Sequence, residues 1–295
     1  MSLEIEGRIT KGIGGEYTIL LDKGESVLAK PRGIFRNKKM VPTVGDYCCI
    51  EPSGDPDIPY TIVSIHERKN ILIRPSVANL DTLIIAVSVI DPEPDLKLLD
   101  KLLIISAKLQ IDPIVWLTKT DLAPDIANDL EKEYSEAGFH VVRSSVHEEI
   151  PHDMIRRIFD GHTVGIAGQS GVGKSTLCNR LTGMEDIEVG SISERLRRGK
   201  HTTRHVELFS FEHGFLVDTP GFSSLDIGEV GLTTDDVILG YPELLKIKGE
   251  CKFLDCRHKG ELGCKVDSSG ISSGRLARYR EFLDIMIERS KRYGK

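Results

Sequence analysis

The chain has 295 residues, with 40% hydrophobic and 28% charged, which is ordinary for a soluble globular protein of two or three domains. Its longest apolar run, Leu83–Ile90, is far shorter than the ~20 residues that span a membrane, and its acidic first residues lack the pattern of a signal peptide. We therefore expect a cytoplasmic protein, and the net charge of −6 argues against a general nucleic-acid binder.

Residues 1–68 are typical of a small β-barrel. Apolar residues form five short runs separated by glycine and proline turns, and no long helical period interrupts them. The expected strands are Glu4–Ile9, Glu16–Leu21, Ser26–Ala29, Asp46–Glu51 and Tyr60–His66. This pattern indicates a barrel of the OB or SH3-like kind, which can present a face to nucleic acid.

Residues 69–226 alternate between strand and helix patterns, which predicts an α/β fold with a parallel sheet covered by helices. The expected strands are Asp81–Ile90, Pro113–Leu117, Phe139–Arg143, Thr163–Ala167 and the hairpin Val206–Phe211 with Gly214–Val217. The expected helices are Leu96–Leu109, Ile126–Ala137, Asp153–Phe159 and one that begins at Ser175. Residues 227–295 lack a strand pattern and combine a cysteine-rich loop with one long helix, Ser273–Arg292.

Residues 168–175 match the phosphate-binding loop pattern G-x-x-x-x-G-K-S between an expected strand and an expected helix. Glycines let the backbone curl so that its N–H groups point at phosphate, and the helix N-terminus adds partial positive charge. We expect Lys174 to reach the β- and γ-phosphates and to act in catalysis, and Ser175 to bind Mg²⁺. The expected nucleotide contacts are Gly168, Gln169, Ser170, Gly171, Val172, Gly173, Lys174, Ser175 and Thr176.

Thr118-Lys-Thr-Asp121 follows a buried strand and resembles the guanine motif NKxD. The carboxylate of Asp121 can accept hydrogen bonds from N1–H and the 2-amino group of guanine, which adenine lacks, and Lys119 packs along the nucleotide. Thr118 replaces the asparagine, so we expect loss of a side-chain tie to the phosphate loop and modest guanine affinity. Ser144 and Ser145 follow the next strand and resemble the short motif whose backbone N–H meets guanine O6. Alternatively, residues 118–121 are only a loop.

Asp218-Thr-Pro-Gly221 resembles the DxxG motif of GTPases, in which the aspartate holds Mg²⁺ through a water and the glycine N–H contacts the γ-phosphate. The residues between this motif and the phosphate loop include Thr202 and Thr203, one of which completes the Mg²⁺ shell. We assign Mg²⁺ to Ser175, Asp218 and Thr203, with Thr202 as the alternative to Thr203.

Phe222 stands where Ras-type enzymes have the glutamine that orients the attacking water. A phenylalanine cannot orient water, so His201 is the candidate catalytic residue nearby. The alternative is that His201 contacts RNA or solvent.

The order of the motifs is rotated relative to small GTPases, in which the phosphate loop comes first. Here the guanine motifs precede the phosphate loop, and the threonine pair and Asp218–Gly221 follow it. This order predicts a circularly permuted GTPase. Because the chain leads from Gly221 into the C-terminal region, we expect GTP hydrolysis to displace residues ~222–295.

Cys251, Cys256, His258 and Cys264 supply three thiolates and one imidazole, a set that suits a structural tetrahedral Zn²⁺. The loop around them is short and polar, so a metal would supply the core that it lacks. A disulfide or an inert cluster is the alternative.

Taken together, the barrel, the permuted motifs and the Cys-x₄-Cys-x-His-x₅-Cys spacing resemble the RsgA (YjeQ/YloQ) family of ribosome small-subunit-dependent GTPases over the whole chain. The resemblance implies GTP hydrolysis that is slow alone and stimulated by the 30S subunit, a role in late maturation of that subunit, and contacts of the barrel and zinc domain with 16S rRNA. It also implies a cytoplasmic, non-membrane protein, and we expect a monomer. Basic residues at 30–39, 195–204 and 246–295 fit RNA contact or ordinary solvated surface.

Two rival functions remain open at this point. One is a GTP-regulated switch that acts on a protein partner without direct rRNA binding. The other is a non-enzymatic RNA-binding module whose nucleotide site only senses GTP.

Overall fold

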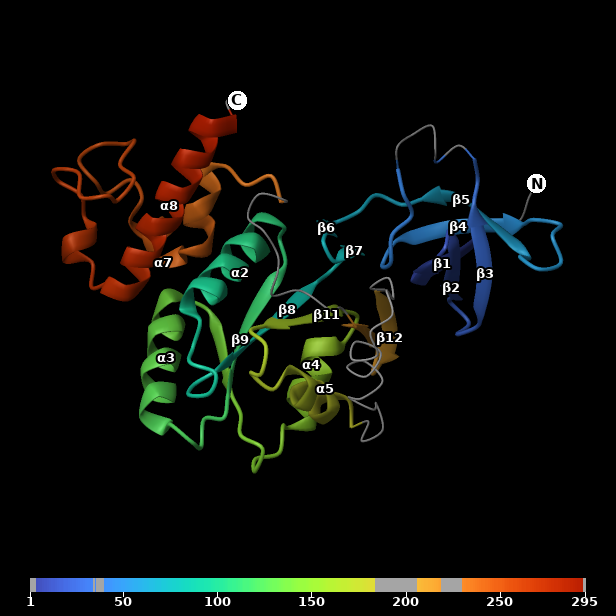
Figure 1. Ribbon diagram of the computed structural model, residues 1–295, viewed down its shortest axis with the longest axis horizontal. Helices are drawn as coiled ribbons and strands as arrows, with labels where there is room; N and C mark the ends of the chain where they lie inside the picture. Colours follow the sequence, from blue (N-terminus) through green and yellow to red (C-terminus); the bar gives the residue numbers. More distant parts are fainter. Residues whose placement is uncertain (1–3, 34, 36–39, 184–205, 219–229, 294–295) are drawn as a thin grey trace. The chain divides into compact units, whose positions relative to one another are not determined.

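The computed structural model describes residues 4–33, 35, 40–183, 206–218 and 230–293 of the chain (Figure 1). The chain divides into two compact units, each built from three segments. The first unit comprises Met1–Thr82, Ile150–Ile166 and Ser175–Phe222, and the second comprises Leu83–Glu149, Ala167–Lys174 and Ser223–Lys295. The expected domain boundaries at residues 68 and 226 stay predictions.

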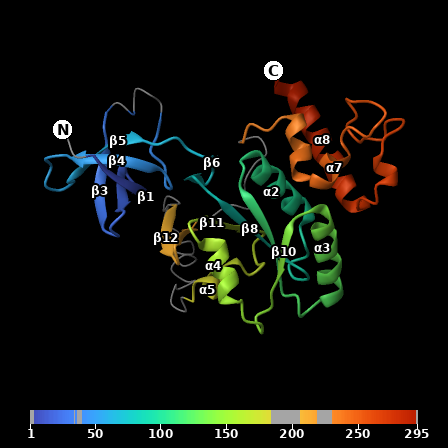
Figure 2. The ribbon, with the colours of Figure 1, turned by 180° about the vertical axis from the view of Figure 1, so that it is seen from behind.

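Five strands of the first unit close a barrel (Figure 2). They are β1 (Ile5–Ile13), β2 (Glu16–Leu21), β3 (Ser26–Pro31), β4 (Tyr47–Pro52) and β5 (Tyr60–Ile65). β1 pairs with β2 and β4, β2 pairs with β3, and β5 pairs with β3 and β4, so every strand has a partner on each side. Fully buried apolar side chains fill the barrel: Ile9, Ile19, Ala29, Ile50 and Ile62. The expected five-stranded barrel is confirmed.

The strands of the barrel differ in detail from the sequence pattern. β1 runs to Ile13, beyond the expected end at Ile9, because a bulge between Ile9 and Lys11 lets the strand keep pairing with β2. A short hairpin that the sequence did not predict follows the barrel, formed by β6 (Ile71–Ile73) and β7 (Ser76–Ala78).

The first unit also holds part of the α/β layer. It contains β11 (Thr163–Gly168), β12 (Glu207–Phe211), β13 (Gly214–Asp218), α4 (His152–Phe159) and α5 (Lys174–Thr182). β11 pairs in parallel with β13, and β12 and β13 form the expected antiparallel hairpin. β13 therefore ends beside the strand that leads into the phosphate loop.

A buried arginine joins the barrel to β11 within this unit. Arg8 of β1 is 5% exposed and donates hydrogen bonds to Thr163 Oγ1 at 2.5 Å and to the Gly45 carbonyl at 3.3 Å. Its guanidinium lies over the rings of Tyr47 and Phe215, at 4.7 and 4.5 Å from their centroids. Burial lowers the pKa of Arg8, and the two ring faces offset part of that cost.

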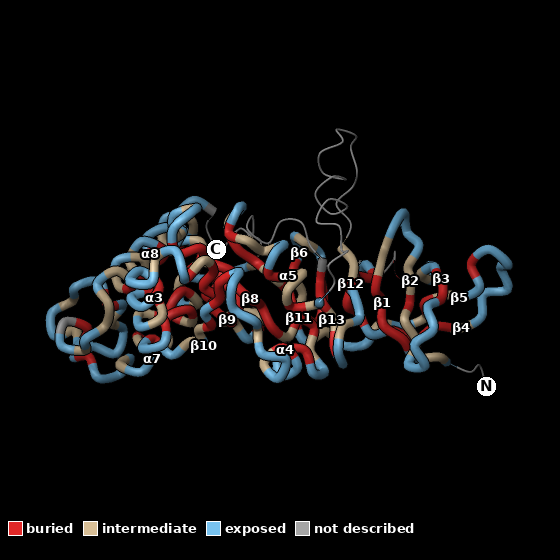
Figure 3. The backbone as a smooth tube through the Cα atoms, turned by 90° about the horizontal axis from the view of Figure 1, so that it is seen from below, coloured by how far each residue is buried: buried red, intermediate tan, exposed pale blue. Residues whose placement is uncertain are grey.

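The second unit contains three strands in the order β10-β9-β8 with helices beside them. Its elements are β8 (Thr82–Ser88), α2 (Leu96–Lys108), β9 (Asp112–Thr118), α3 (Pro124–Ala137) and β10 (His140–Arg143). β8 is buried over its whole length, as its apolar run predicts (Figure 3). Local signals set the helix ends: Asp95 caps α2 by accepting the Leu98 N–H at 2.8 Å, and Gly138 closes α3 with φ +105°.

The described C-terminal part of the second unit combines four helices with the cysteine-bearing loop. The helices are the 3₁₀ helices η2 (Thr234–Gly240) and η3 (Val266–Ser268) and the α-helices α7 (Pro242–Ile247) and α8 (Ser273–Tyr293). η2 and α7 pack on α2 and α3 respectively. None of the helices in the described part of the chain combines the length and hydropathy that crossing a bilayer requires.

A buried ionic cluster holds α8 against this unit. The Asp100 carboxylate of α2 is fully buried and accepts hydrogen bonds from Arg275 Nη1 and Arg278 Nε of α8, both at 2.6 Å. The hydroxyls of Tyr134 and Tyr241 also donate to it, at 2.8 and 3.1 Å. One carboxylate therefore joins α2, α3, α8 and the segment between η2 and α7, and the sequence did not single it out.

Replacing Asp100 by alanine should destabilise the second unit by about 3–5 kcal/mol, because it removes the buried carboxylate that Arg275 and Arg278 share and leaves them, among the described residues, only Glu243 and Glu133 as carboxylate partners. Urea unfolding followed by fluorescence measures the change, since the single tryptophan, Trp116, is buried in β9 of the same unit.

Lys97→Ala is the matched control. Lys97 also links α2 to α8, through a 2.7 Å ion pair with Glu281, but both side chains are about half exposed or more. Such a pair contributes about 0–1 kcal/mol. Equal effects of the two substitutions would contradict the importance of the buried cluster.

Candidate functional site

The phosphate loop has the backbone geometry that its glycines predict. Gly168 closes β11 with φ +140°, and a Cβ there would lie 2.2 Å from the Ala86 carbonyl oxygen, so no larger residue fits. Gly171 and Gly173 also have positive φ, of +85° and +91°. The loop therefore curls before it enters α5, as a phosphate-binding loop must.

Lys174 lies at the start of α5 with its ammonium held across this loop. Its Nζ donates to the carbonyls of Gly168 at 2.9 Å and Gln169 at 2.7 Å. Burial lowers the pKa of Lys174, because it removes water from around the ammonium. A phosphate group beside the ammonium would offset that loss and stabilise the charged form. The next residues, Ser175 and Thr176, are exposed on the first turn of α5.

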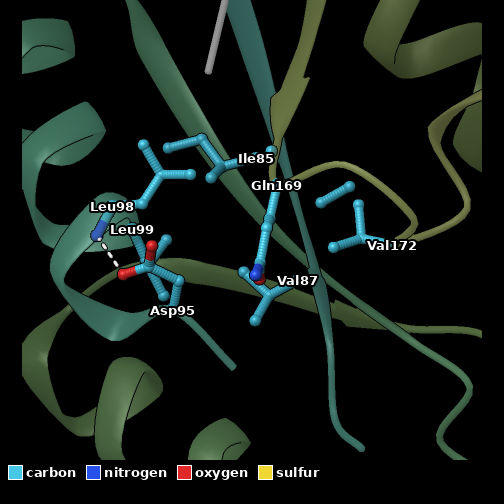
Figure 4. Close-up of a pocket in the computed structure, with 9 residues that line it drawn as sticks. Ile85, Val87, Asp95, Leu98, Leu99, Gln169 and Val172 are labelled. Carbon is cyan, nitrogen blue, oxygen red and sulfur yellow. Dashed lines mark hydrogen bonds between the residues drawn. The ribbon is translucent and has the colours of Figure 1, made fainter. Parts of the chain in front are cut away.

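Side chains behind the loop support it and leave no room for a ligand. Figure 4 shows the Gln169 side chain extending from the loop toward Val87, with Val172 to one side and Asp95 and Leu98 of α2 to the other. The cavity among them is about 10 Å³, room for about one water. This cavity is therefore too small to hold a nucleotide.

Two side chains of the 118–121 segment tie it to the phosphate loop. Thr118 ends β9, and its hydroxyl donates to the Val172 carbonyl at 2.7 Å. Lys119 has φ +59°, and its ammonium donates to the Gly171 carbonyl at 3.3 Å and to the Asp91 carbonyl. The expectation that threonine loses this tie is wrong, because the hydroxyl is long enough to reach the loop.

The serine pair is used partly for structure. Ser144 is buried, accepts the Trp116 indole N–H at 2.8 Å, and gives its own backbone N–H to the Leu117 carbonyl at 2.9 Å. The Thr120 N–H and hydroxyl both donate to the Ser144 carbonyl, at 3.3 and 3.2 Å. The two guanine-motif segments are thus joined to each other, and both belong to the unit that holds residues 168–174.

One neighbour of the guanine motif was missed from the sequence. His147 Nε2 lies 3.8 Å from Asp121 Oδ2, with 78% of the His147 side chain and 28% of the Asp121 side chain exposed. Its spacing after Ser144 and Ser145 gives no periodic signal that would have singled it out.

Part of the expected site lies outside the described residues. His201, Thr202, Thr203 and Gly221 fall in the undescribed segments, and Asp218 is placed only as the last residue of β13. Their roles in Mg²⁺ binding and catalysis stay predictions.

The four expected zinc ligands are brought together. All four ligand atoms of Cys251, Cys256, His258 and Cys264 lie within 4.8 Å of one another. His258 directs Nδ1 at the sulfurs, at 3.7, 3.8 and 3.3 Å from those of Cys251, Cys256 and Cys264. All six cysteines are free, so the disulfide alternative finds no support.

The chemistry of this cluster fits a Zn²⁺ ion. Burial lowers the pKa of His258, which keeps the imidazole in the neutral form that binds metals. Burial, and then hydrogen bonds to Cys264 and Cys251, raise the pKa of Cys256 to about 12. Three thiolates at such short distances repel one another, so a bound cation is needed for all three to be deprotonated in this site. His258 is itself fully buried, and its Nε2 has no hydrogen-bond partner in the described part of the chain.

Helix α8 supports the loop that carries these ligands. The Tyr279 hydroxyl donates to the Arg257 carbonyl at 3.1 Å, and Arg280 Nε donates to the His258 carbonyl at 2.8 Å. The backbone on both sides of the histidine ligand is thereby fixed by the helix that also carries Arg275 and Arg278.

The chain is similar in sequence and structure to known proteins. A family model described as RsgA GTPase matches residues 65–228, and one described as RsgA N-terminal domain matches residues 6–57. The chain belongs to the RsgA GTPase family. A relative from Alkaliphilus metalliredigens is 39% identical over 295 residues, which cover 98% of this chain and 99% of the relative. A relative from Clostridium botulinum (strain 657) is 37% identical over 294 residues, with the same coverage. Both are named small ribosomal subunit biogenesis GTPase RsgA.

Two solved structures are similar over nearly the whole chain. YloQ, described as a circularly permuted GTPase, has a TM-score of 0.79 at 30% identity and covers 97% of this chain and 96% of its own. YjeQ from Thermotoga maritima has a TM-score of 0.79 at 28% identity and covers 97% and 99%. These comparisons confirm the family resemblance and the α/β fold with its N-terminal barrel and permuted GTPase part. They also confirm the GTP hydrolase class, with GTP/GDP and Mg²⁺ as its ligands.

Thr118→Val should weaken binding of guanine nucleotides about fivefold, because it removes the hydrogen bond to the Val172 carbonyl, a loss of about 1 kcal/mol. Titration with a fluorescent GDP analogue measures the dissociation constant. Thr118→Ser keeps the hydroxyl and should bind like the unchanged protein. Equal weakening in both variants contradicts the role of the tie.

Cys264→Ser should lower the zinc content by one equivalent per chain and expose the 251–268 loop to protease, because three remaining ligands and a short polar loop hold the metal poorly. Elemental analysis and limited proteolysis measure these effects. Cys178→Ser, on α5 and outside the cluster, is the control. A full zinc content in Cys264→Ser would count against the assignment.

Proposed function

We propose that this GTPase acts on the small ribosomal subunit during its late maturation, hydrolysing GTP to GDP and phosphate with stimulation by that subunit. The observation that carries the nucleotide part is the pair of ties from Thr118 and Lys119 to the phosphate loop, which bring the guanine motif and the phosphate cradle together. The names of the close full-length relatives support the ribosomal part.

Within the nucleotide site, each residue has a distinct proposed task. Residues 168–176 cradle the phosphates, with Lys174 on the β- and γ-phosphates. Asp121 accepts the guanine N1–H and 2-amino hydrogens. Because the Ser144 N–H is engaged by Leu117, the N–H of Ser145 is the donor proposed for guanine O6.

The metal and water ligands form a second group of proposed roles. Ser175, Asp218 and Thr203, with Thr202 as the alternative to Thr203, hold Mg²⁺, which would neutralise charge on the phosphates. His201 orients the attacking water, because Phe222 cannot. Cys251, Cys256, His258 and Cys264 hold one structural Zn²⁺.

The remaining proposals concern partners. We divide the chain into the barrel at 1–68, the permuted GTPase domain at 69–226 and the zinc-binding domain at 227–295, with barrel and zinc domain contacting 16S rRNA. Basic residues at 30–39 and 246–295 and the barrel fold support this division of labour. A cytoplasmic monomer is the state in which we expect it to act.

GTP turnover measured with and without purified small ribosomal subunits, at two salt concentrations, tests the proposal. We expect slow turnover alone, strong stimulation by subunits, and stimulation that falls as salt rises because phosphate contacts release counterions. Lys174→Ala should lose turnover under both conditions, whereas Lys132→Ala on α3 should not. Stimulation that is absent or indifferent to salt favours a protein partner, and no turnover even with subunits favours a GTP-sensing RNA-binding module.

Asp121→Asn should reverse base preference from guanine to xanthine nucleotides. The amide can donate to the extra carbonyl of xanthine but cannot accept both guanine hydrogens. Competition binding with GDP and xanthosine diphosphate measures the ratio of affinities. Asp125→Asn, on the first turn of α3, is the control. Retention of guanine preference in Asp121→Asn would remove Asp121 from the base site.

A further inference from the structure

Three residues with metal-binding side chains lie side by side on the barrel, far in sequence from the C-terminal cysteine cluster. Glu6 is on β1, Cys49 is on β4, and His66 follows β5 directly. In the strand register, Cys49 lies opposite Glu6 on one side and opposite Ser64 on the other. Because side chains alternate along a strand, His66, two residues past Ser64, faces the same side as Cys49 and Glu6.

The ligand atoms of these three residues have the spacing of a metal site. The carboxylate oxygen, the sulfur and the imidazole nitrogen all lie within 4.8 Å of one another, and Cys49 Sγ is 3.4 Å from His66 Nε2. A tetrahedral Zn²⁺ with its usual bond lengths sets sulfur and nitrogen about 3.6 Å apart. The C-terminal cluster has the same separations, from 3.3 to 3.8 Å.

The surroundings distinguish this cluster from a chance contact of surface side chains. Cys49 is 7% exposed, while Glu6 on β1 and His66 just after β5 are exposed. One thiolate, one carboxylate and one neutral imidazole balance the charge of a divalent cation. The neighbouring Cys48 does not compete, because it is fully buried and lies on the opposite face of β4.

We propose that Glu6, Cys49 and His66 form a second Zn²⁺ site on the outer face of the barrel, with its fourth position open to water or to an anionic ligand. Three protein ligands with an open fourth position are typical of zinc that binds water or a further ligand, in contrast to the closed four-ligand C-terminal cluster. The ion would crosslink β1, β4 and the end of β5. The site lies in the barrel and does not depend on the proposed ribosomal function.

Zinc content per chain, measured on the full-length protein after equilibration with Zn²⁺ and gel filtration in a non-thiol reductant, tests the proposal. We expect two equivalents in the unchanged protein and one in Cys49→Ser and in His66→Gln. Glu6→Gln should weaken the second equivalent by about tenfold or more. Two controls, Glu4→Gln and His140→Gln, change exposed residues of the same types and should keep two equivalents.

Cobalt substitution adds a spectroscopic signal that would not change if Cys49 had only a structural role. Co²⁺ added to protein whose C-terminal cluster is already filled with Zn²⁺ should give a thiolate-to-cobalt charge-transfer absorption that is absent in Cys49→Ser and weaker in His66→Gln. His66 is on the surface, so His66→Gln should fold normally by circular dichroism. A single equivalent of zinc in the unchanged protein, or two equivalents in both Cys49→Ser and His66→Gln, would overturn the proposal.

Discussion

The second unit depends on one buried carboxylate. Asp100 has no exposed surface, and two guanidiniums and two phenols surround it. Burial raises the pKa of Tyr134 well above its ordinary value, so that phenol stays a neutral donor to the carboxylate. A lone buried charge would be costly, whereas this one is matched in charge and saturated in hydrogen bonds. The cluster thereby determines which face of α8 packs against α2 and α3.

The same cluster constrains how the C-terminal region can move. The sequence suggested that hydrolysis displaces residues ~222–295, but α8 is bound to α2 and α3 through Arg275 and Arg278. Any displacement of α8 would carry α2 and α3 with it or would have to break buried ion pairs. The 118–121 segment follows β9 of the same unit, so a displacement that carried α2 and α3 along would reach this segment as well.

Features that rest on local patterns could be predicted from the sequence. The curled phosphate loop, the buried strand β8, the cap of α3 at Gly138 and the zinc ligand spacing each lie within a few neighbouring residues, so residue types and intervals suffice. Features that join distant residues could not. Asp100 and Arg275 are 175 positions apart, and no spacing rule connects them. The reach of the Thr118 hydroxyl to Val172 likewise depends on how two loops meet, and the expectation built on residue type alone was wrong.

Helix α8 carries two kinds of contact at adjoining positions. Arg275 and Arg278 bind the buried carboxylate, while Tyr279 and Arg280 hold the backbone of the zinc loop. At 1.5 Å rise per residue these contacts fall within about two turns of α8. The helix therefore cannot shift relative to the buried carboxylate without also moving the backbone of the zinc loop. We therefore expect metal occupancy at the zinc loop to stabilise α2 through α8. Amide hydrogens of α2 should then exchange faster with solvent once the metal is removed from the zinc loop.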